Sequence, residues 1–168
     1  MRKFEVVKAD MRKSNGDVIL PKRATKNSIA YDLYSPITTT IPPMQSKLIW
    51  TDIKAKFNPG EALLINVRSS MGKHPIMIAN TQGWIESDYY GNESNDGNIG
   101  VRLLNLSDED YIIKTGDRIA QCMLVNHLTF ENGNTDRNRT GGFGSTGKWC
   151  IKGKILPIIY ISTITGGA

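Results

Sequence analysis

Short apolar or alternating segments recur roughly every ten residues along the chain, as is typical of an all-β protein. They are KFEVV, DVIL, AYDLY, TTTI, KLIWTDIKAKF, ALLINV, IMIAN, IGVRLLNL, YIIK and IAQCMLVN. Turn-forming segments such as SNGD, PPMQ, NPGE and NDGN separate them. No helical period persists beyond a turn or two, although SSMGK fits one short helical turn. The pattern therefore predicts a single all-β sandwich or barrel-like domain.

The composition changes toward the end of the chain, and it divides the chain into three parts. We predict a β domain over residues 1–130 and a flexible arm over 131–148, because the second segment is polar and rich in Gly, Asn and Thr. Residues 149–168 form a tail of unknown role. Within this tail, KILPIIYIST is too short to span a membrane and predicts one more strand.

Length and charge narrow the functional class. The 168 residues are enough for one domain with a hydrophobic core. The net charge of +5 is mild and spread along the chain, so a polyanionic small substrate explains it as well as nucleic acid does. No long Lys/Arg run is interleaved with aromatic residues, and no stretch of 18 apolar residues occurs. We therefore expect no nucleic-acid binding and no membrane span.

Cysteine and histidine positions say little about chemistry but suggest a compartment. Cys122 lies in an apolar run and is expected to be a buried thiol, and with Cys150 it makes no disulfide framework. His74 and His127 lack Cys or His neighbours at ligand spacing, so we expect no zinc site. The start of the chain lacks the apolar region of a secretion signal. These features favour a cytoplasmic protein, and the richness in Lys, Asn and Ile suggests a bacterial or phage-encoded one.

The segment RTGGFGSTGK, Arg139–Lys148, combines glycines with cations, hydroxyls and one phenylalanine. Glycine lets backbone N–H groups approach a ligand, and hydroxyls and arginine suit phosphate oxygens. Its second part, GFGSTGK, nearly has the spacing of a P-loop. Trp149 follows where a Ser or Thr would hold magnesium, and no parallel βαβ unit surrounds it, which disfavours a P-loop NTPase. A phosphate-binding arm is favoured over a plain Gly-rich linker.

The segment GWIESDYYGN contains two acids that are candidates for catalysis. Glu86 and Asp88 are two residues apart, so they share a face if the chain is extended there. A carboxylate near a phosphate is able to orient and deprotonate a water molecule. A solvated acidic turn is the alternative interpretation of the same residues.

Two further segments contain candidate residues. VRSSMGK suggests an anion site, and AYDLYS has an acid inside a strand. Arg68, Ser69 and Ser70 follow an apolar run and begin a helical turn, which suits an anion; a helix N-cap at either serine is the alternative. Asp32 lies within an apolar strand and needs a cation, a structural donor or a metal-bound water as its partner.

Five motifs occur in the order AYDLYS, RSSMGK, NTQGWIESDYYGN, GDRIAQ and RTGGFGSTG. This order closely resembles the homotrimeric type of the dUTP pyrophosphatase (dUTPase) family. The resemblance extends from about Lys3 to Lys148, most of the chain. The first four motifs are each moderately specific, and RTGGFGSTG is highly specific. In GDRIAQ, the acid and the arginine taken alone suggest only a structural turn and a salt bridge.

The resemblance implies a distorted β-jelly-roll that assembles as a homotrimer, with three sites at subunit interfaces. It implies cleavage of dUTP to dUMP and pyrophosphate with Mg²⁺. The implied catalytic residues are Glu86, Asp32 and Arg68. Asp32 would hold a water ligand of the magnesium ion, Arg68 would contact the phosphates, and Glu86 takes the place of the water-activating carboxylate.

The resemblance also implies a set of substrate-binding residues. They are Ser69, Ser70, Asn80, Gly83, Tyr89, Gln121, Arg139, Phe143, Gly144, Ser145 and Thr146. Ser69 and Gln121 would bind phosphate, and Asn80 would recognise the uracil edge together with the strand backbone. Tyr89 would lie against the deoxyribose and leave no room for a 2′-hydroxyl. Arg139, Ser145 and Thr146 would close on the γ-phosphate, with Phe143 stacked on uracil.

The chain departs from the family pattern at the base, which is usually aspartate and here is Glu86. The ordinary pKa values of the two acids differ by only about 0.4, so geometry is the concern. A misplacement of about 1 Å lowers a rate on the order of 100-fold. Three hypotheses follow: Glu86 is the base in a slightly remodelled site, activity is reduced, or the chain is a dUTP-binding regulatory protein with weak or no hydrolysis. We favour the first, with Asp88 as the backup candidate.

Two further differences bear on the resemblance. Ala30 stands where the family usually has glycine, and the tail continues beyond the usual end of the family. The related dCTP deaminases use a glutamate base in the strand that corresponds to NIGVRLLN. Because this segment contains no glutamate, deamination is disfavoured.

Overall fold

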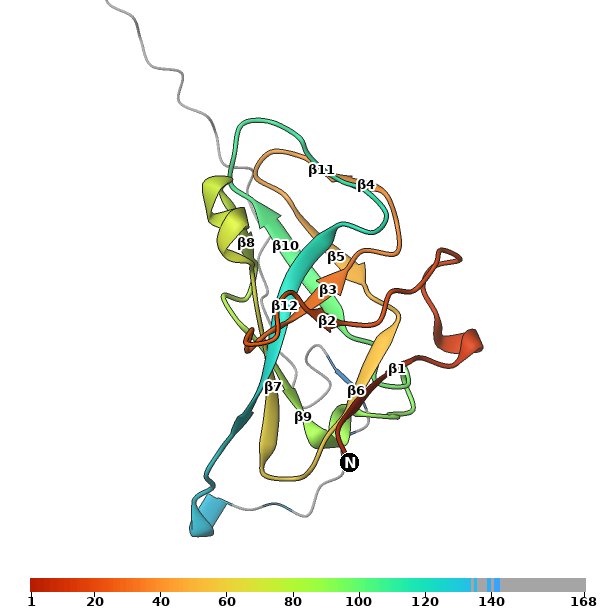
Figure 1. Cartoon of the computed structure of the whole chain (residues 1–168), viewed down its shortest axis with the longest axis vertical. Helices are drawn as coiled ribbons and strands as arrows, with labels where there is room; N and C mark the ends of the chain where they lie inside the picture. The colour runs from red at the N-terminus through yellow and green to blue at the C-terminus, as the bar shows by residue number, and fades with distance from the viewer. Residues whose placement is uncertain (134, 136–138, 140, 143–168) are drawn as a thin grey trace, which may run out of the picture.

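The computed structural model describes residues 1–133, 135, 139, 141 and 142, and strands dominate it (Figure 1). The strands are β1 (Lys3–Val6), β2 (Lys22–Arg23), β3 (Tyr31–Tyr34), β4 (Thr39–Ile41), β5 (Ser46–Trp50), β6 (Ile53–Lys56), β7 (Glu61–Asn66), β8 (Ile76–Ile78), β9 (Gly83–Glu86), β10 (Gly100–Asn105), β11 (Tyr111–Ile113) and β12 (Arg118–Asn126). Short 3-10 turns are η1 (Ala9–Met11), η2 (Ser69–Lys73), η3 (Ser87–Tyr89) and η4 (Glu131–Gly133). The predicted all-β class and the helical turn at SSMGK are confirmed.

Antiparallel hydrogen bonding joins these strands into sheets. The largest sheet has the order β2-β3-β12-β7-β9, a second has the order β5-β10-β8, and β1-β6 and β4-β11 form pairs. In the largest sheet, Gln121 of β12 lies between Asp32 of β3 and Asn66 of β7. These three polar residues therefore form one row across the middle of the sheet.

The hydrophobic core lies between the two larger sheets, whose strands overlap in Figure 1. Leu33 and Leu63 from the first sheet and Ile49 and Leu103 from the second belong to one buried cluster. Because side chains alternate along a strand, the residue next to Leu33 points away from this core. The result is the sandwich expected of a jelly-roll-like fold.

Cys122 is buried in this core, as predicted. Burial raises the pKa of its thiol to about 12, and the negative charge of nearby Asp32 adds to the rise. A thiol with so high a pKa stays protonated near neutral pH and is a poor nucleophile. Cys122 is therefore a packing residue.

Two predicted strands differ in the structure. KLIWTDIKAKF is divided into β5 and β6, because Asp52 between them has a left-handed φ of 56°. DVIL forms no strand, and Ile19 and Leu20 are exposed. Pro21 follows this segment and offers no backbone donor for a sheet ladder. Both differences come from local backbone constraints that override the apolar pattern.

The carboxylate of Asp52 is fully buried and is surrounded by hydrogen-bond donors. It accepts bonds from the backbone N–H of Lys13 (2.8 Å), from both the backbone N–H (3.0 Å) and the hydroxyl (2.6 Å) of Ser14, and from Asn98 Nδ2 (2.8 Å). The Asp52 backbone N–H donates in turn to Asn98 Oδ1 at 3.0 Å. One side chain thus joins the N-terminal segment, the β5–β6 junction and the segment before β10.

Several predictions concern residues outside the described part of the chain, including the strand at KILPIIYIST and the roles of Phe143, Gly144, Ser145 and Thr146. The domain boundaries stay predictions. Among the residues that are described, no helix has the length and apolar character needed to cross a membrane.

We expect Asp52→Ala to lower the free energy of unfolding by about 3–5 kcal/mol, because it leaves several buried donors without an acceptor. Urea denaturation followed by circular dichroism measures the change. Asp10→Ala, at an exposed position, is the matched control and should stay within about 0.5 kcal/mol of the wild type. Equal stability of the two variants would contradict the role assigned to Asp52.

Candidate functional site

A cavity of about 360 Å³ lies beside the β8–β9 connection. Its lining includes five of the predicted site residues: Asn80, Gly83, Glu86, Tyr89 and Arg139. Ile65, Ile78 and Val101 form apolar parts of the wall. A pocket with an apolar wall and a few polar groups at its rim suits a small planar ring.

The β8–β9 connection shapes one side of this cavity. Thr81 has a φ of 66°, and its N–H donates to the Ile78 carbonyl at 2.8 Å, which makes the turn tight. Asn80 Nδ2 donates to the Gln82 carbonyl at 3.2 Å. A Cβ atom at Gly83 would lie 3.1 Å from the Cβ of Ile65, so glycine allows β9 to lie close against β7. The turn therefore presents backbone groups and the Asn80 side chain at the cavity rim.

Tyr89 forms a rigid part of the wall because both its ring and its hydroxyl are fixed. The hydroxyl donates to the Asn98 carbonyl at 2.8 Å and accepts a bond from Asn95 Nδ2 at 2.7 Å. Burial raises the pKa of this phenol, so it remains neutral and able to donate. A Cβ atom at Gly142 would lie 2.7 Å from Tyr89 Cε2, so only glycine fits against the ring at that point.

The two acids of GWIESD converge on one cation. Glu86 ends β9 and Asp88 lies in η3, so the expectation that they share a face of one extended strand is wrong. Arg139 Nη2 nevertheless lies 2.7 Å from Glu86 Oε2, and Arg139 Nε lies 3.0 Å from Asp88 Oδ1. The 3-10 turn brings Asp88 to the same guanidinium that Glu86 reaches from the strand end. This convergence could not be read from residue spacing.

A second cluster gathers the residues expected to bind phosphate. The buried carboxylate of Asp32 accepts a bond from Arg68 Nε at 2.7 Å, and Arg118 Nη1 lies 3.5 Å away from it. Arg68 Nη1 donates to Ser70 Oγ at 3.3 Å, and Gln121 Nε2 donates to the Val67 carbonyl at 3.2 Å. The partner that the sequence required for Asp32 is therefore a cation.

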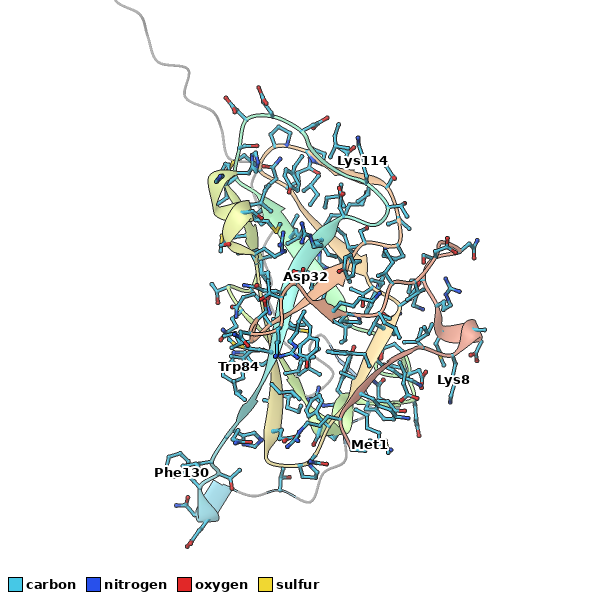
Figure 2. The ribbon with its side chains drawn as sticks, viewed as in Figure 1. Met1, Lys8, Asp32, Trp84, Lys114 and Phe130 are labelled. Atoms are coloured by element: carbon cyan, nitrogen blue, oxygen red, sulfur yellow. The ribbon has the colours of Figure 1, made fainter. Side chains whose placement is uncertain are left out.

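The cavity and the cluster around Asp32 are separate places on one chain. Asp32, Arg68 and Gln121 do not line the cavity. β3 and β9 are three strands apart in the largest sheet, which is roughly 14 Å at the usual strand spacing. In Figure 2 Asp32 is labelled near the middle of the ribbon and Trp84 toward its edge. The predicted site residues that the structure describes thus fall into two groups, one at the cavity and one around Asp32.

Trp84 and Arg102 are among the cavity residues that the sequence did not single out. Trp84 on β9 is 57% exposed, and Arg102 on β10 is exposed as well; both line the cavity. The Ala79 N–H donates to the Arg102 carbonyl at 2.9 Å, which holds Arg102 beside the turn. Arg102 is the charged residue within the apolar segment IGVRLLNL, and that was the signal available in the sequence.

The comparisons with known proteins point to one family. The family model described as dUTPase matches residues 16–147. The deoxyuridine 5′-triphosphate nucleotidohydrolase of Lactococcus lactis subsp. lactis is 36% identical over 150 residues, covering 88% of this chain and 98% of that protein. The protein of the same name from Finegoldia magna is 38% identical over 146 residues, covering 82% and 96%.

A solved structure supports the fold as well. The dUTPase from Streptococcus mutans matches with a TM-score of 0.68 and 31% identity, over 76% of this chain and 98% of that chain. Family model, sequence relatives and structure agree over most of the length. We conclude that the chain belongs to the dUTPase family.

Proposed function

We propose that this chain hydrolyses dUTP to dUMP and pyrophosphate, with Mg²⁺ and with Glu86 as the base, at sites shared between the subunits of a homotrimer. As a member of the dUTPase family, the chain is a dUTP diphosphatase. The observation that carries the assignment of the site is the cavity, where Asn80, Gly83, Glu86 and Tyr89 meet. The chemistry of these residues suits a uracil nucleoside.

The uracil ring would enter between the β8–β9 turn and β10. Apolar side chains of Ile65, Ile78 and Val101 would contact the ring faces, while Asn80 and the turn backbone pair with the ring edge. A slot built to hydrogen-bond one edge rejects a base with a different donor pattern, because its own polar groups are then left unpaired. This accounts for selection of uracil over cytosine.

Tyr89 would select the sugar. Its ring cannot retreat, because Asn95 and Asn98 fix the hydroxyl and Gly142 packs on the ring edge. A rigid aromatic wall against the sugar leaves no space for a 2′-hydroxyl. Rigidity, rather than a specific repulsive group, would discriminate dUTP from UTP.

Arg68 and Gln121 would bind the phosphates. Arg68 is 22% exposed, and its Nε–Asp32 contact fixes the guanidinium while leaving N–H donors for a ligand. Charge-assisted bonds from a fixed arginine are strong and directional, as binding of a triphosphate requires. Ser69 and Ser70 lie on the adjacent exposed turn η2.

Mg²⁺ fits this donor set if the substrate phosphates supply most of its ligands. Both oxygens of Asp32 already face arginines, so Asp32 would hold the ion through a water molecule. In the described part of the chain, no group of three or more His, Cys, Asp or Glu residues could hold a metal ion by itself. One carboxylate together with substrate phosphates is a common Mg²⁺ environment. When bound, the ion neutralises charge on the triphosphate.

Glu86 would take the proton of the attacking water. Its side chain is 55% exposed at the end of β9, at the cavity rim, and its contact with Arg139 uses one carboxylate oxygen. The other oxygen accepts no hydrogen bond from the described residues and would face the water. The attack on the α-phosphorus would release pyrophosphate toward the arginines.

Sharing of the site between subunits is supported by the separation of its two halves. The cavity would supply the contacts to the uracil and the sugar, and the cluster around Asp32 would supply the phosphate contacts; Asp32 itself is on β3, three strands from β9. A second copy that brings its Asp32 cluster to the cavity would complete the site. Closed rotational symmetry repeats such a contact around a trimer.

The wild-type chain should release pyrophosphate from dUTP with Mg²⁺, and not from dCTP, dTTP or UTP. We expect Glu86→Gln to lower kcat by about 100-fold or more, because the base is lost. Glu86→Asp, run in parallel, tests the effect of the extra methylene. Glu93→Gln, an exposed acid on the following loop, is the control.

Full activity of Glu86→Gln would remove Glu86 as the base. A wild-type chain that binds dUTP without hydrolysing it would instead favour the dUTP-binding regulatory protein.

Asp32→Asn should raise the Mg²⁺ concentration for half-maximal rate by about tenfold or more, because the water-bound ion loses a charged acceptor. A magnesium titration at saturating dUTP measures it, with Asp10→Asn as the control. An unchanged titration curve would contradict a role of Asp32 in holding the ion.

Mixing two inactive variants tests the shared site. Glu86→Gln and Arg68→Ala chains, denatured together and refolded at equal amounts, should regain about a quarter of wild-type activity if the two residues of one site come from different chains. Size-exclusion chromatography with light scattering would verify the trimer. No recovery, with trimers present, would place both residues of a site on one chain.

A further inference from the structure

Asp88 is a carboxylate at the cavity that the proposed mechanism does not use. It lies in η3, two residues after the proposed base, and its Oδ1 accepts a bond from Arg139 Nε at 3.0 Å. No other hydrogen bond of the Asp88 side chain is seen in the described part of the chain. Because Asp88 contacts an arginine of the proposed site, it is a candidate for holding Arg139 in position.

Arg139 is held from several sides. Nη2 donates to Glu86 Oε2 at 2.7 Å, Nη1 donates to the Gly141 carbonyl at 3.2 Å, and the guanidinium carbon lies 5.9 Å from the centre of the Tyr89 ring. The Arg139 side chain is only 17% exposed. Among the described residues, these contacts are the ones that hold the guanidinium.

The guanidinium retains binding capacity in this position. Arginine has five N–H donors, and the contacts to Glu86, Asp88 and Gly141 use three of them. Among the described residues, one N–H of Nη1 and one of Nη2 therefore have no protein acceptor. An arginine anchored through Nε thus keeps the pair of donors that suits two phosphate oxygens.

We infer that Asp88 is a positioning residue, which anchors Arg139 through Nε so that its free donors await the distal phosphates of the substrate. This inference rests on the proposed function, in which Arg139 binds the γ-phosphate. Glu86 contributes to the same anchor, but it is also the proposed base, so Asp88 is the residue whose removal isolates the effect.

The energetic reason is preorganisation. Asp88 and Glu86 are 57% and 55% exposed, so each contact by itself is weakened by water. Together with the Tyr89 ring, these two acids restrict the Arg139 side chain before the substrate binds. Without them, Arg139 would lose its rotamer freedom only on binding. A cation ordered in advance binds its ligand more tightly, because that loss precedes binding.

Binding measurements separate this role from a general structural one. For Asp88→Asn we expect a non-hydrolysable α,β-imido analogue of dUTP to bind about three- to tenfold more weakly, while dUMP, which lacks the distal phosphates, binds as before. Glu93→Gln removes a nearby exposed charge without touching Arg139 and is the control. Isothermal titration calorimetry measures both ligands.

Kinetics and a double-mutant cycle test whether Asp88 acts through Arg139. Asp88→Asn should raise KM for dUTP by the same factor with kcat within about twofold, and Asp88→Glu, which keeps a charged acceptor, should recover part of the loss. Arg139→Ala should weaken analogue binding, and adding Asp88→Asn to it should cause little further loss. Three results would each overturn the inference. They are equal losses of affinity for dUMP and for the analogue, additive losses in the double variant, and an Asp88→Asn variant whose analogue affinity and KM equal those of the wild type.

A substrate-free measurement distinguishes failure of this inference from failure of the proposed function. Trypsin must bind the Arg139 side chain to cleave after it, so cleavage there should be at least about threefold faster in Asp88→Asn than in wild type or Glu93→Gln. Mass spectrometry identifies the site. Equal cleavage rates would overturn the anchor even in an active enzyme, whereas faster cleavage in a chain that does not bind dUTP would contradict only the proposed function.

Discussion

The geometry of the cavity depends on one buried carboxylate, that of Asp52. It binds both the N-terminal segment and Asn98, and the Asn98 carbonyl in turn accepts the hydroxyl of Tyr89. Tyr89 forms the cavity wall and lies beneath the guanidinium of Arg139. A buried charge is stable only when donors surround it, so the segments that supply these donors are fixed together. A polar network therefore supports Tyr89, while the apolar part of the cavity wall comes from the core residues Ile65, Ile78 and Val101.

Paired charges distinguish the two halves of the site. In the cluster around Asp32, the acid is buried and its arginines are partly exposed. At the cavity the relation is reversed: Arg139 is mostly buried, and Glu86 and Asp88 are exposed. In the proposed function, the first arrangement would hold a carboxylate in place beside the phosphates. The second leaves the carboxylates in contact with water, which is the condition that a base acting on water requires.

The substitution of glutamate for aspartate has a structural context in this chain. Glu86 is the last residue of β9, and its longer side chain reaches the arm residue Arg139. The methylene that separates it from aspartate is accommodated at an exposed strand end and not inside a packed core. Steric strain therefore does not oppose glutamate at this position. In the proposed reaction, the replacement of aspartate by glutamate would act through the position of the carboxylate relative to the attacking water.

The sequence by itself determined the all-β class, the helical turn at SSMGK, the buried thiol of Cys122 and the family, because each depends on local pattern or on motif order. It also showed that Asp32 needed a partner, but only the fold identified that partner as Arg68. The break at Asp52, the convergence of Glu86 and Asp88 on Arg139, and the cavity positions of Trp84 and Arg102 were decided by tertiary structure. The physical reason is that they depend on contacts between segments far apart in the chain, which periodicity and spacing do not encode.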